Sequence, residues 1–284
     1  MARVADGHNR WDLGAAVVER IAYFDTPLPA ETIDLVGAVE DLAWSDPWQS
    51  DGQPAVGQAF WIVTVGDRSI VVDPCGASDD FLRTGPDAVG HQDAAFAAFE
   101  AAGHDPEAVE QVVLTHLDGI GMTALADGGA AGEERWRPAF PNATVVVSRA
   151  ELAHIAANPE QCPGAAAFGQ LDDAGIVRGV EVPAEVLPGV SLEWTGGHGP
   201  GHCVVRARGT DREAVLIGHL AVSPLHAGRP ASGPHLDQAG AWKSLAAILE
   251  RSAGIDALVA GALWPAPGSA TVEVTPDGYV LTPA

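Results

Sequence analysis

The sequence predicts an α/β fold, organised as one domain over residues 1–284 with residues 1–57 as an N-terminal lead-in. Apolar runs rich in valine and isoleucine alternate with segments of helix composition. No linker or internal repeat divides the chain. The histidines that stand out follow directly after predicted strands, where α/β folds commonly place their sites. These three observations favour a sheet-based domain with its chemistry at the strand ends.

In the first half, short strand-like and irregular segments of the lead-in are followed by a predicted β-hairpin over residues 59–76. Its two β-branched and aromatic runs flank Gly66 and Asp67, which are residue types favoured in tight turns. Residues 93–111 have helix composition, interrupted by a Gly-containing break before a second short helix. The apolar run over residues 111–116 then predicts a buried strand.

In the second half, residues 142–157 predict a strand followed by a helix. Ser148 is placed to cap this helix, and Glu151 three residues later completes a capping-box pattern. Residues 190–209 predict a strand, a glycine-rich turn and a second strand. The alternation continues with a strand ending in a loop, an amphipathic helix and a buried strand, over residues 213–225, 238–254 and 256–261.

Charge and cysteine content restrict the class of partner. The formal net charge is -23, from 38 acidic against 15 basic residues. Because such a surface repels phosphate backbones and anionic lipid, we expect neither nucleic acid nor membrane as a partner. The three cysteines form no C-x-x-C pair, the start does not resemble a signal peptide, and no apolar run reaches the roughly 18 residues of a membrane span. We therefore expect a cytoplasmic protein.

Potential metal ligands occur at several strand-to-loop boundaries. Neutral imidazole and carboxylate groups suit zinc or ferrous iron. On these patterns alone the metal site stays open, because His-x-Asp is a weak signal and a glycine-rich turn with two histidines is as often a plain surface turn. The candidates are His116 with Asp118, His198 with His202, His219, and Asp73 at the end of an earlier strand.

Six blocks of sequence, in a fixed order, connect the chain to a known family. They are SIVVDPCG, DPEAVEQVVLTHLDGIGM, PAFPNATVVVSRAE, TGGHGPGHCVV, IGHLAVSPLH and GALWPAPGSATV. From about residue 58 onward the chain resembles the metallo-β-lactamase-fold hydrolases, most closely their lactonase and methyl-parathion-hydrolase-like branch. The resemblance implies an αββα four-layer sandwich with metals bound between two sheets.

The same resemblance implies a degenerate metal motif. The family's first motif histidine falls on His116 and its Pro-Gly-His ligand on His202. In an ungapped alignment the second histidine falls on Asp118, and the aspartate that bridges two metals falls on His219. A two-residue gap would instead place Asp118 on the aspartate that serves the second metal. The pair for that metal otherwise falls on side chains that cannot coordinate, Ile120 and Gly121, and the last histidine falls on Leu263.

The resulting expectation is one divalent metal, with zinc preferred and iron or no metal as alternatives, held by His116, Asp118, His202 and His219. Replacing a bridging carboxylate by a histidine agrees with loss of the second ion. We expect Asp73 to orient a metal-binding histidine and His198 to support the ligands rather than coordinate.

Four further residues are expected to assist a ligand or contact substrate, namely His226, His235, Met122 and Trp264. For the histidines the ordinary alternative is a solvent-facing loop, and for Met122 and Trp264 it is the hydrophobic core. Cys203 follows His202 and is expected to pack in the core rather than act as a nucleophile.

Three functions are consistent with these residues. The first is a single-metal hydrolase of a small lactone, ester or related molecule, with Asp118 and His219 as catalytic groups. The second is a metal-free relative, either a binding protein or an enzyme that uses histidines for an acid–base isomerisation or cyclisation. The third is a mononuclear iron oxygenase with two histidines and one carboxylate. The expected partner is a small-molecule substrate, and a homodimer is possible.

Overall fold

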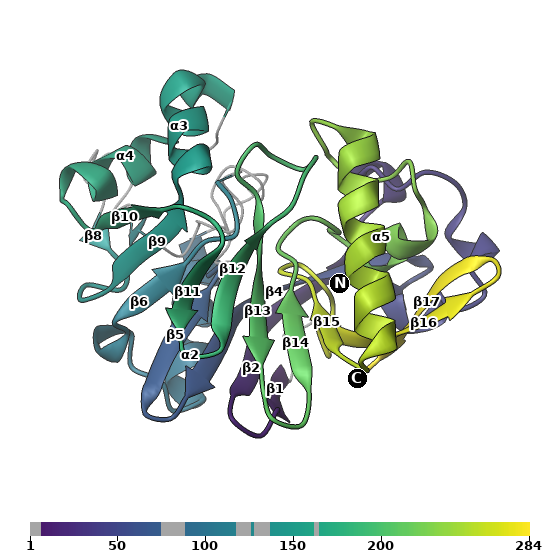
Figure 1. Ribbon diagram of the computed structural model, residues 1–284, viewed down its shortest axis with the longest axis horizontal. Coiled ribbons are helices and arrows are strands. Elements are labelled where there is room, and N and C mark those ends of the chain that lie inside the picture. Colours follow the sequence, from purple (N-terminus) through teal and green to yellow (C-terminus); the bar gives the residue numbers. More distant parts are fainter. Residues whose placement is uncertain (1–6, 75–88, 118–125, 128–136, 162–164) are drawn as a thin grey trace.

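The computed structural model describes residues 7–74, 89–117, 126–127, 137–161 and 165–284 of the chain (Figure 1). Two β-sheets face each other, with helices on both sides of the pair. The core between the sheets contains strand residues from both, including Val18 and Val113 from the first sheet and Leu192 and Leu216 from the second. This arrangement is the αββα sandwich that the sequence resemblance implied, and that prediction is confirmed.

The first sheet has the strand order β1-β2-β4-β5-β6-β9-β10, with β3 paired to β4. Strands β5, β6, β9 and β10 are parallel to one another, and the strands before them pair antiparallel. The strands are β1 (Gly7–Asp12), β2 (Val17–Pro27), β3 (Gln49–Ser50), β4 (Gln53–Val65), β5 (Arg68–Val72), β6 (Gln111–Val113), β9 (Thr144–Ser148) and β10 (Val177–Val180).

The hairpin predicted around Gly66 and Asp67 is confirmed, because β4 and β5 pair with Val65 opposite Arg68. The N-terminal lead-in is more regular than the sequence suggested. Its strand β2 pairs along its length with β4 and holds β1 on its other edge. Residues 7–27 are therefore part of the first sheet.

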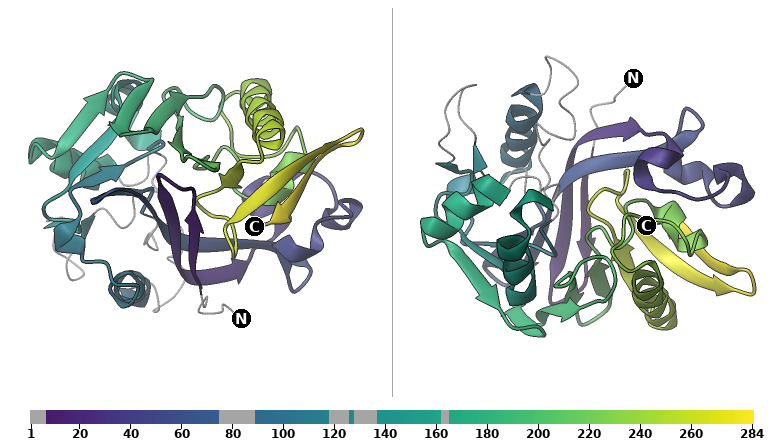
Figure 2. Two further views of the ribbon diagram at one scale, coloured as in Figure 1. Left: turned by 60° about the horizontal axis from the view of Figure 1, so that its bottom comes forward. Right: turned by 90° about the horizontal axis from the view of Figure 1, so that it is seen from above.

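The second sheet has the order β11-β12-β13-β14-β15-β16-β17, in which only β14 and β15 pair in parallel. Figure 2 shows its last hairpin, β16–β17, in yellow at the sheet edge. A short pair, β7 (Ala126–Asp127) with β8 (Arg137–Pro138), lies apart from both sheets. The strands of the second sheet are β11 (Ala184–Leu187), β12 (Val190–Trp194), β13 (Cys203–Arg208), β14 (Glu213–Leu216), β15 (Leu258–Ala260), β16 (Ser269–Thr275) and β17 (Gly278–Pro283).

The helices cover the outer faces of the sheets. Helices α2 (Val89–Ala101), α3 (Arg149–Ala157) and α4 (Ala165–Asp173) pack against the first sheet through side chains such as Phe99, Ile155 and Phe168. Helix α5 (Gln238–Gly254) packs against the second sheet. Short 3-10 turns are η1 (Ala30–Ile33), η2 (Val39–Asp41), η3 (Asp46–Trp48), η4 (Pro106–Ala108), η5 (Pro159–Gln161) and η6 (Pro224–Gly228).

Two helix predictions are confirmed in detail. Helix α5 occupies the predicted residues and begins after Asp237, whose carboxylate accepts from the backbone N–H of Gly240. Ser148 caps α3 by accepting from the N–H of Glu151 at 3.1 Å. Among the helices described, none is long and apolar enough to span a membrane.

Candidate metal centre between the sheets

His116 is delivered by the first sheet. Strand β6 ends at Val113, and the residues that follow, including Thr115 and His116, are buried. Asp73 follows β5, which is parallel to β6, so both chain ends reach the same edge of the sheet. There the backbone N–H and the hydroxyl of Thr115 donate to the two carboxylate oxygens of Asp73 at 2.8 and 2.7 Å.

His198 and His202 come from the turn between β12 and β13 of the second sheet. The backbone N–H of Cys203 donates to the carbonyl of Thr115 at 2.9 Å, which joins this turn directly to the loop after β6. Across from it, the backbone N–H of Asp237 donates to the carbonyl of Gly197 at 2.8 Å, at the entrance to α5. The turn is thus held by the loop after β6 and by the start of α5, and its two histidines lie beside His116.

The start of α3 also holds this turn. The carboxylate of Glu151 accepts from the N–H of Gly201 at 3.0 Å, and the hydroxyl of Ser148 donates to the Gly201 carbonyl at 2.8 Å. Only the first half of the predicted capping box is therefore formed within α3. Ser148 caps the helix, whereas the Glu151 carboxylate binds the turn that carries His198 and His202. Glu151 is 3% exposed, so this contact is shielded from water.

His219 follows β14 and reaches the same place. Gly218 precedes it with φ +55°, and a Cβ at that position would collide with the Thr115 hydroxyl and lie 3.1 Å from Nε2 of His202. The Nδ1 of His219 lies 3.1 Å from Nε2 of His116. A glycine is therefore required where β14 delivers His219 against its neighbours.

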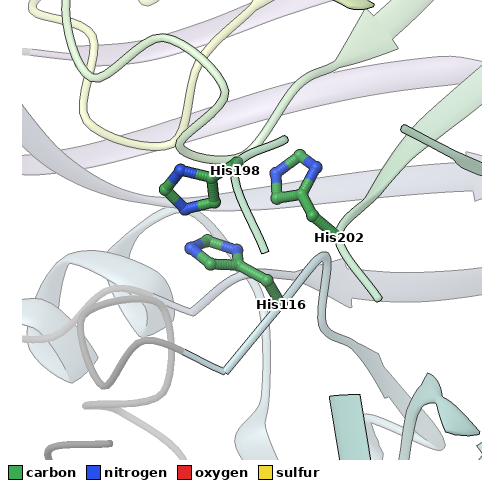
Figure 3. Close-up of side chains that lie close together, drawn as sticks. All are labelled: His116, His198 and His202. Carbon is green, nitrogen blue, oxygen red and sulfur yellow. The ribbon is translucent and has the colours of Figure 1, made fainter. Parts of the chain in front are cut away.

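His116, His198 and His202 form a group whose ligand nitrogens all lie within 4.8 Å of one another. Figure 3 shows the three rings close together, with His116 on one chain segment and His198 and His202 on another. Adjacent nitrogens around a tetrahedral zinc ion are about 3.3 Å apart, from Zn–N bonds of about 2.0–2.1 Å. Three buried imidazoles with their nitrogens this close together could hold a divalent metal ion.

The hydrogen bonds of two threonines assign the tautomers of His116 and His202. The Thr115 hydroxyl donates to Asp73 and lies 2.8 Å from Nδ1 of His116. The Thr195 hydroxyl donates to the His202 carbonyl and lies 2.6 Å from Nδ1 of His202. Because each hydroxyl has given its proton elsewhere, it accepts from Nδ1–H, and Nε2 of each ring is left unprotonated. Nε2 of His116 faces Nδ1 of His219 at 3.1 Å, from which it can accept a hydrogen bond.

Burial shapes the electrostatics of the centre. Desolvation raises the pKa of the Asp73 carboxyl, while nearby His116 and the two hydrogen bonds from Thr115 act in the opposite direction. Burial, together with Glu151 and Asp73, raises the pKa of the Cys203 thiol to about 12. Cys203 is fully buried in the core between the sheets, so the prediction of core packing is confirmed and a thiolate nucleophile is excluded at neutral pH.

The remaining sequence candidates fall in different places. Asp118 and Met122 lie outside the described residues. Nδ1 of His235 lies 3.0 Å from Nδ1 of His198, so His235 is in contact with the group. His226 is fully buried, and burial together with His235 lowers its pKa to about 3, which keeps the ring neutral.

The structure distinguishes the alternatives for two further positions. The sequence favoured a supporting role for His198, whereas the structure places its ring nitrogens among those of His116 and His202. For Trp264 the core alternative holds, because its indole N–H donates to the Ala221 carbonyl at 2.8 Å and its ring packs edge-on against Trp48 in the core on the α5 side of the second sheet. A large apolar side chain with its one donor satisfied is stable there.

The fold is that of the metallo-β-lactamase hydrolases, as solved structures show. A hydrolase of the β-lactamase superfamily, AbOPH, matches with a TM-score of 0.79 and 19% identity over 99% of each chain. AidC, a dizinc quorum-quenching lactonase solved with a product, matches with a TM-score of 0.76 and 16% identity, covering 98% of this chain and 97% of its own. A probable metal-dependent hydrolase from Staphylococcus aureus matches with a TM-score of 0.70 and 14% identity over 96% and 99%.

These identities establish the fold, and the resemblance inferred from the six sequence blocks is confirmed at that level. No protein-family model matches the sequence, and no curated protein matches it.

Proposed function

We propose that this protein is a metal-dependent hydrolase of a small lactone or ester, with one divalent ion held by His116, His198 and His202. The observation that carries the proposal is the convergence of three buried imidazoles within 4.8 Å in a fold shared with metal-dependent hydrolases. Zinc is the expected metal, since a set of nitrogen donors suits it. When bound, zinc lowers the pKa of a coordinated water to about 7 and polarises a carbonyl.

The surrounding residues would prepare this site. By accepting from Nδ1–H, Thr115 and Thr195 would leave Nε2 of His116 and His202 available to a metal ion, and Asp73 acts through Thr115. Three protein ligands leave the fourth position of a tetrahedral ion for water or substrate. Asp118, two residues after His116, stays our candidate for an additional ligand or a general base.

We assign His219 to proton transfer beside the ion. Its ring centroid lies 4.7 Å from that of His116 and 6.4 Å from that of His198, so it sits at one side of the triad. Its role differs from that of the three ligands in a measurable way. Replacing a ligand removes the metal, whereas replacing a proton-transfer group leaves the metal and lowers kcat.

The test compares metal content and turnover in purified protein, measured by elemental analysis and by hydrolysis of a panel of lactones and aryl esters. We expect His202→Ala to contain about one zinc ion fewer per chain than the unaltered protein and to lose turnover. We expect His219→Gln to keep the metal while kcat falls by about 10²–10⁴-fold. Full activity in chelator with no metal bound would refute the proposal and favour histidine-based acid–base chemistry, and iron in place of zinc would favour an oxygenase.

A further inference from the structure

A second group of metal-binding side chains lies away from the site between the sheets. It consists of His8 on β1, Glu19 on β2 and His104 in the turn between α2 and η4. Nε2 of His8 lies 2.9 Å from Oε1 of Glu19, and Nε2 of His104 lies 3.8 Å from Oε2 of the same carboxylate. The three ligand atoms lie within 4.8 Å of one another. We call these residues the outer-face group.

Strand alternation separates this group from the first site. Val18 on β2 faces the core between the sheets, and Glu19, the next residue, faces the opposite side together with Ile21. Ile21 packs in the core beneath α2, and the His104 ring lies 5.2 Å from Phe99 of that helix. The outer-face group therefore lies on the helix-covered face of the first sheet, with the sheet itself between it and the core that faces His116.

We propose that the outer-face group binds one divalent transition-metal ion, for which zinc is the test ligand. Two imidazoles and one carboxylate are a donor set that zinc accepts. The 2.9 Å between His8 and Glu19 is close to the separation of neighbouring ligand atoms around such an ion. Glu19 is nearly buried at 7% side-chain exposure, so its charge is poorly hydrated, while His8 at 41% leaves a path for the ion.

His104 comes from a part of the chain distant from both strands. Its Nε2 lies 3.8 Å from Oε2 of Glu19, and its ring packs against Phe99 of α2. An ion here would join the first strand of the described chain to the turn after α2, so occupancy would also stabilise the folded state by linkage.

Arg10 supplies an internal competitor. It is the direct cross-strand partner of Glu19, and its guanidinium Nη1 lies 3.6 Å from Oε1 of that carboxylate. A metal ion and this guanidinium would compete for the same charge. Removing Arg10 should therefore strengthen metal binding, whereas removing either histidine should weaken it. If the group were only an ion-pair network, removing Arg10 and removing a histidine would not have opposite effects on zinc binding.

The experiment is equilibrium dialysis of the full chain against buffered zinc at pH 7.5, with bound zinc counted by elemental analysis. We expect His8→Ala, at an exposed position, to lower the zinc stoichiometry by about one ion per chain. His154→Ala, which removes a half-buried histidine of α3 outside both groups, should leave it unchanged. The same dialysis of His202→Ala separates the two sites, because that variant should keep the ion lost in His8→Ala.

Arg10→Ala provides the second readout, and we expect it to bind this zinc ion several-fold more tightly and to raise the zinc-dependent shift in Tm. Unchanged zinc stoichiometry in both His8→Ala and His104→Ala, or weaker binding in Arg10→Ala, would overturn the proposal. Those results would leave the outer-face group as an ion-pair network only.

Discussion

Thr195→Val tests whether the orientation of His202 matters for metal binding, because it leaves His202 in place and removes only the hydroxyl that orients it. The change removes the hydroxyl that accepts from Nδ1–H of His202 at 2.6 Å while preserving the shape of a buried side chain. Without this acceptor, the His202 proton is free to move to Nε2, where it would occupy the position needed for the metal. The ligand would still be present, but its tautomer and ring orientation would no longer be fixed.

The expected magnitudes follow from the contacts. Loss of a partner that orients a metal-binding histidine typically reduces metal affinity by about 10–100-fold, or about 1.4–2.7 kcal/mol. The cost to folding should be smaller. The His202 carbonyl, which also accepts from the Thr195 hydroxyl at 3.2 Å, keeps its hydrogen bond from the Thr195 backbone N–H at 3.0 Å. The free energy of unfolding should therefore fall by only about 0.5–1.5 kcal/mol.

The assay is competition for zinc against a chromophoric chelator, with urea unfolding of the metal-free protein in parallel. Thr64→Val is the control, because it removes a threonine hydroxyl bonded to Ser69 at 2.8 Å on strand β4. We expect the zinc affinity of the control to match that of the unaltered protein. If Thr195→Val folds and binds zinc within twofold of the unaltered protein, the assignment of the His202 tautomer is wrong.

Three further changes test other parts of the account. Gly218→Ala should lower the zinc stoichiometry in the dialysis assay by about one ion per chain and leave the ion of the outer-face group, because its Cβ would collide with the Thr115 hydroxyl at φ +55°. Glu151→Ala should lower the free energy of unfolding by about 1–3 kcal/mol in urea because it leaves the Gly201 N–H without its acceptor, whereas Glu151→Gln, which retains an acceptor oxygen, should recover most of it. The pKa of His226 is lowered to about 3 in the folded protein, so below pH 6.5 the unfolded chain binds a proton that the folded protein does not bind. The free energy of unfolding therefore falls as the pH falls from about 6.5 towards 3. His226→Gln should lose about 2 kcal/mol less than the unaltered protein between pH 7 and pH 5, and equal losses in urea titrations at the two pH values would contradict this origin.

The sequence predicted those elements whose determinants are local. The β4–β5 hairpin follows from turn residues between two β-branched runs, and α5 from its periodicity and its Asp237 cap. The β16–β17 hairpin was missed, although residues 275–278, Thr-Pro-Asp-Gly, carry a turn signal between two runs of strand composition. Strand β2 was underestimated because its polar residues, Glu19 and Arg20, are buried against partners distant in sequence, namely His104 and the Trp264 carbonyl.

Those histidines of the candidate site that follow predicted strands could be identified from the sequence. His116, His202 and His219 follow strands β6, β12 and β14, and the structure brings the three together. The position of His198 was not predictable, because it depends on contacts from elsewhere. Two hydrogen bonds position the turn that carries His198. The N–H of Gly201 donates to the Glu151 carboxylate, and the N–H of Asp237 donates to the Gly197 carbonyl. The four-residue spacing of His198 and His202 was the only local signal.

The central claim is that His116, His198 and His202 together hold an ion. The most direct measurement is an anomalous difference map from crystals of the zinc-loaded protein, collected on both sides of the zinc absorption edge. We expect a peak among the three rings, about 2.0–2.1 Å from Nε2 of His116 and Nε2 of His202. A map with no zinc peak between these rings, in protein shown to be exposed to zinc at neutral pH, would contradict the account.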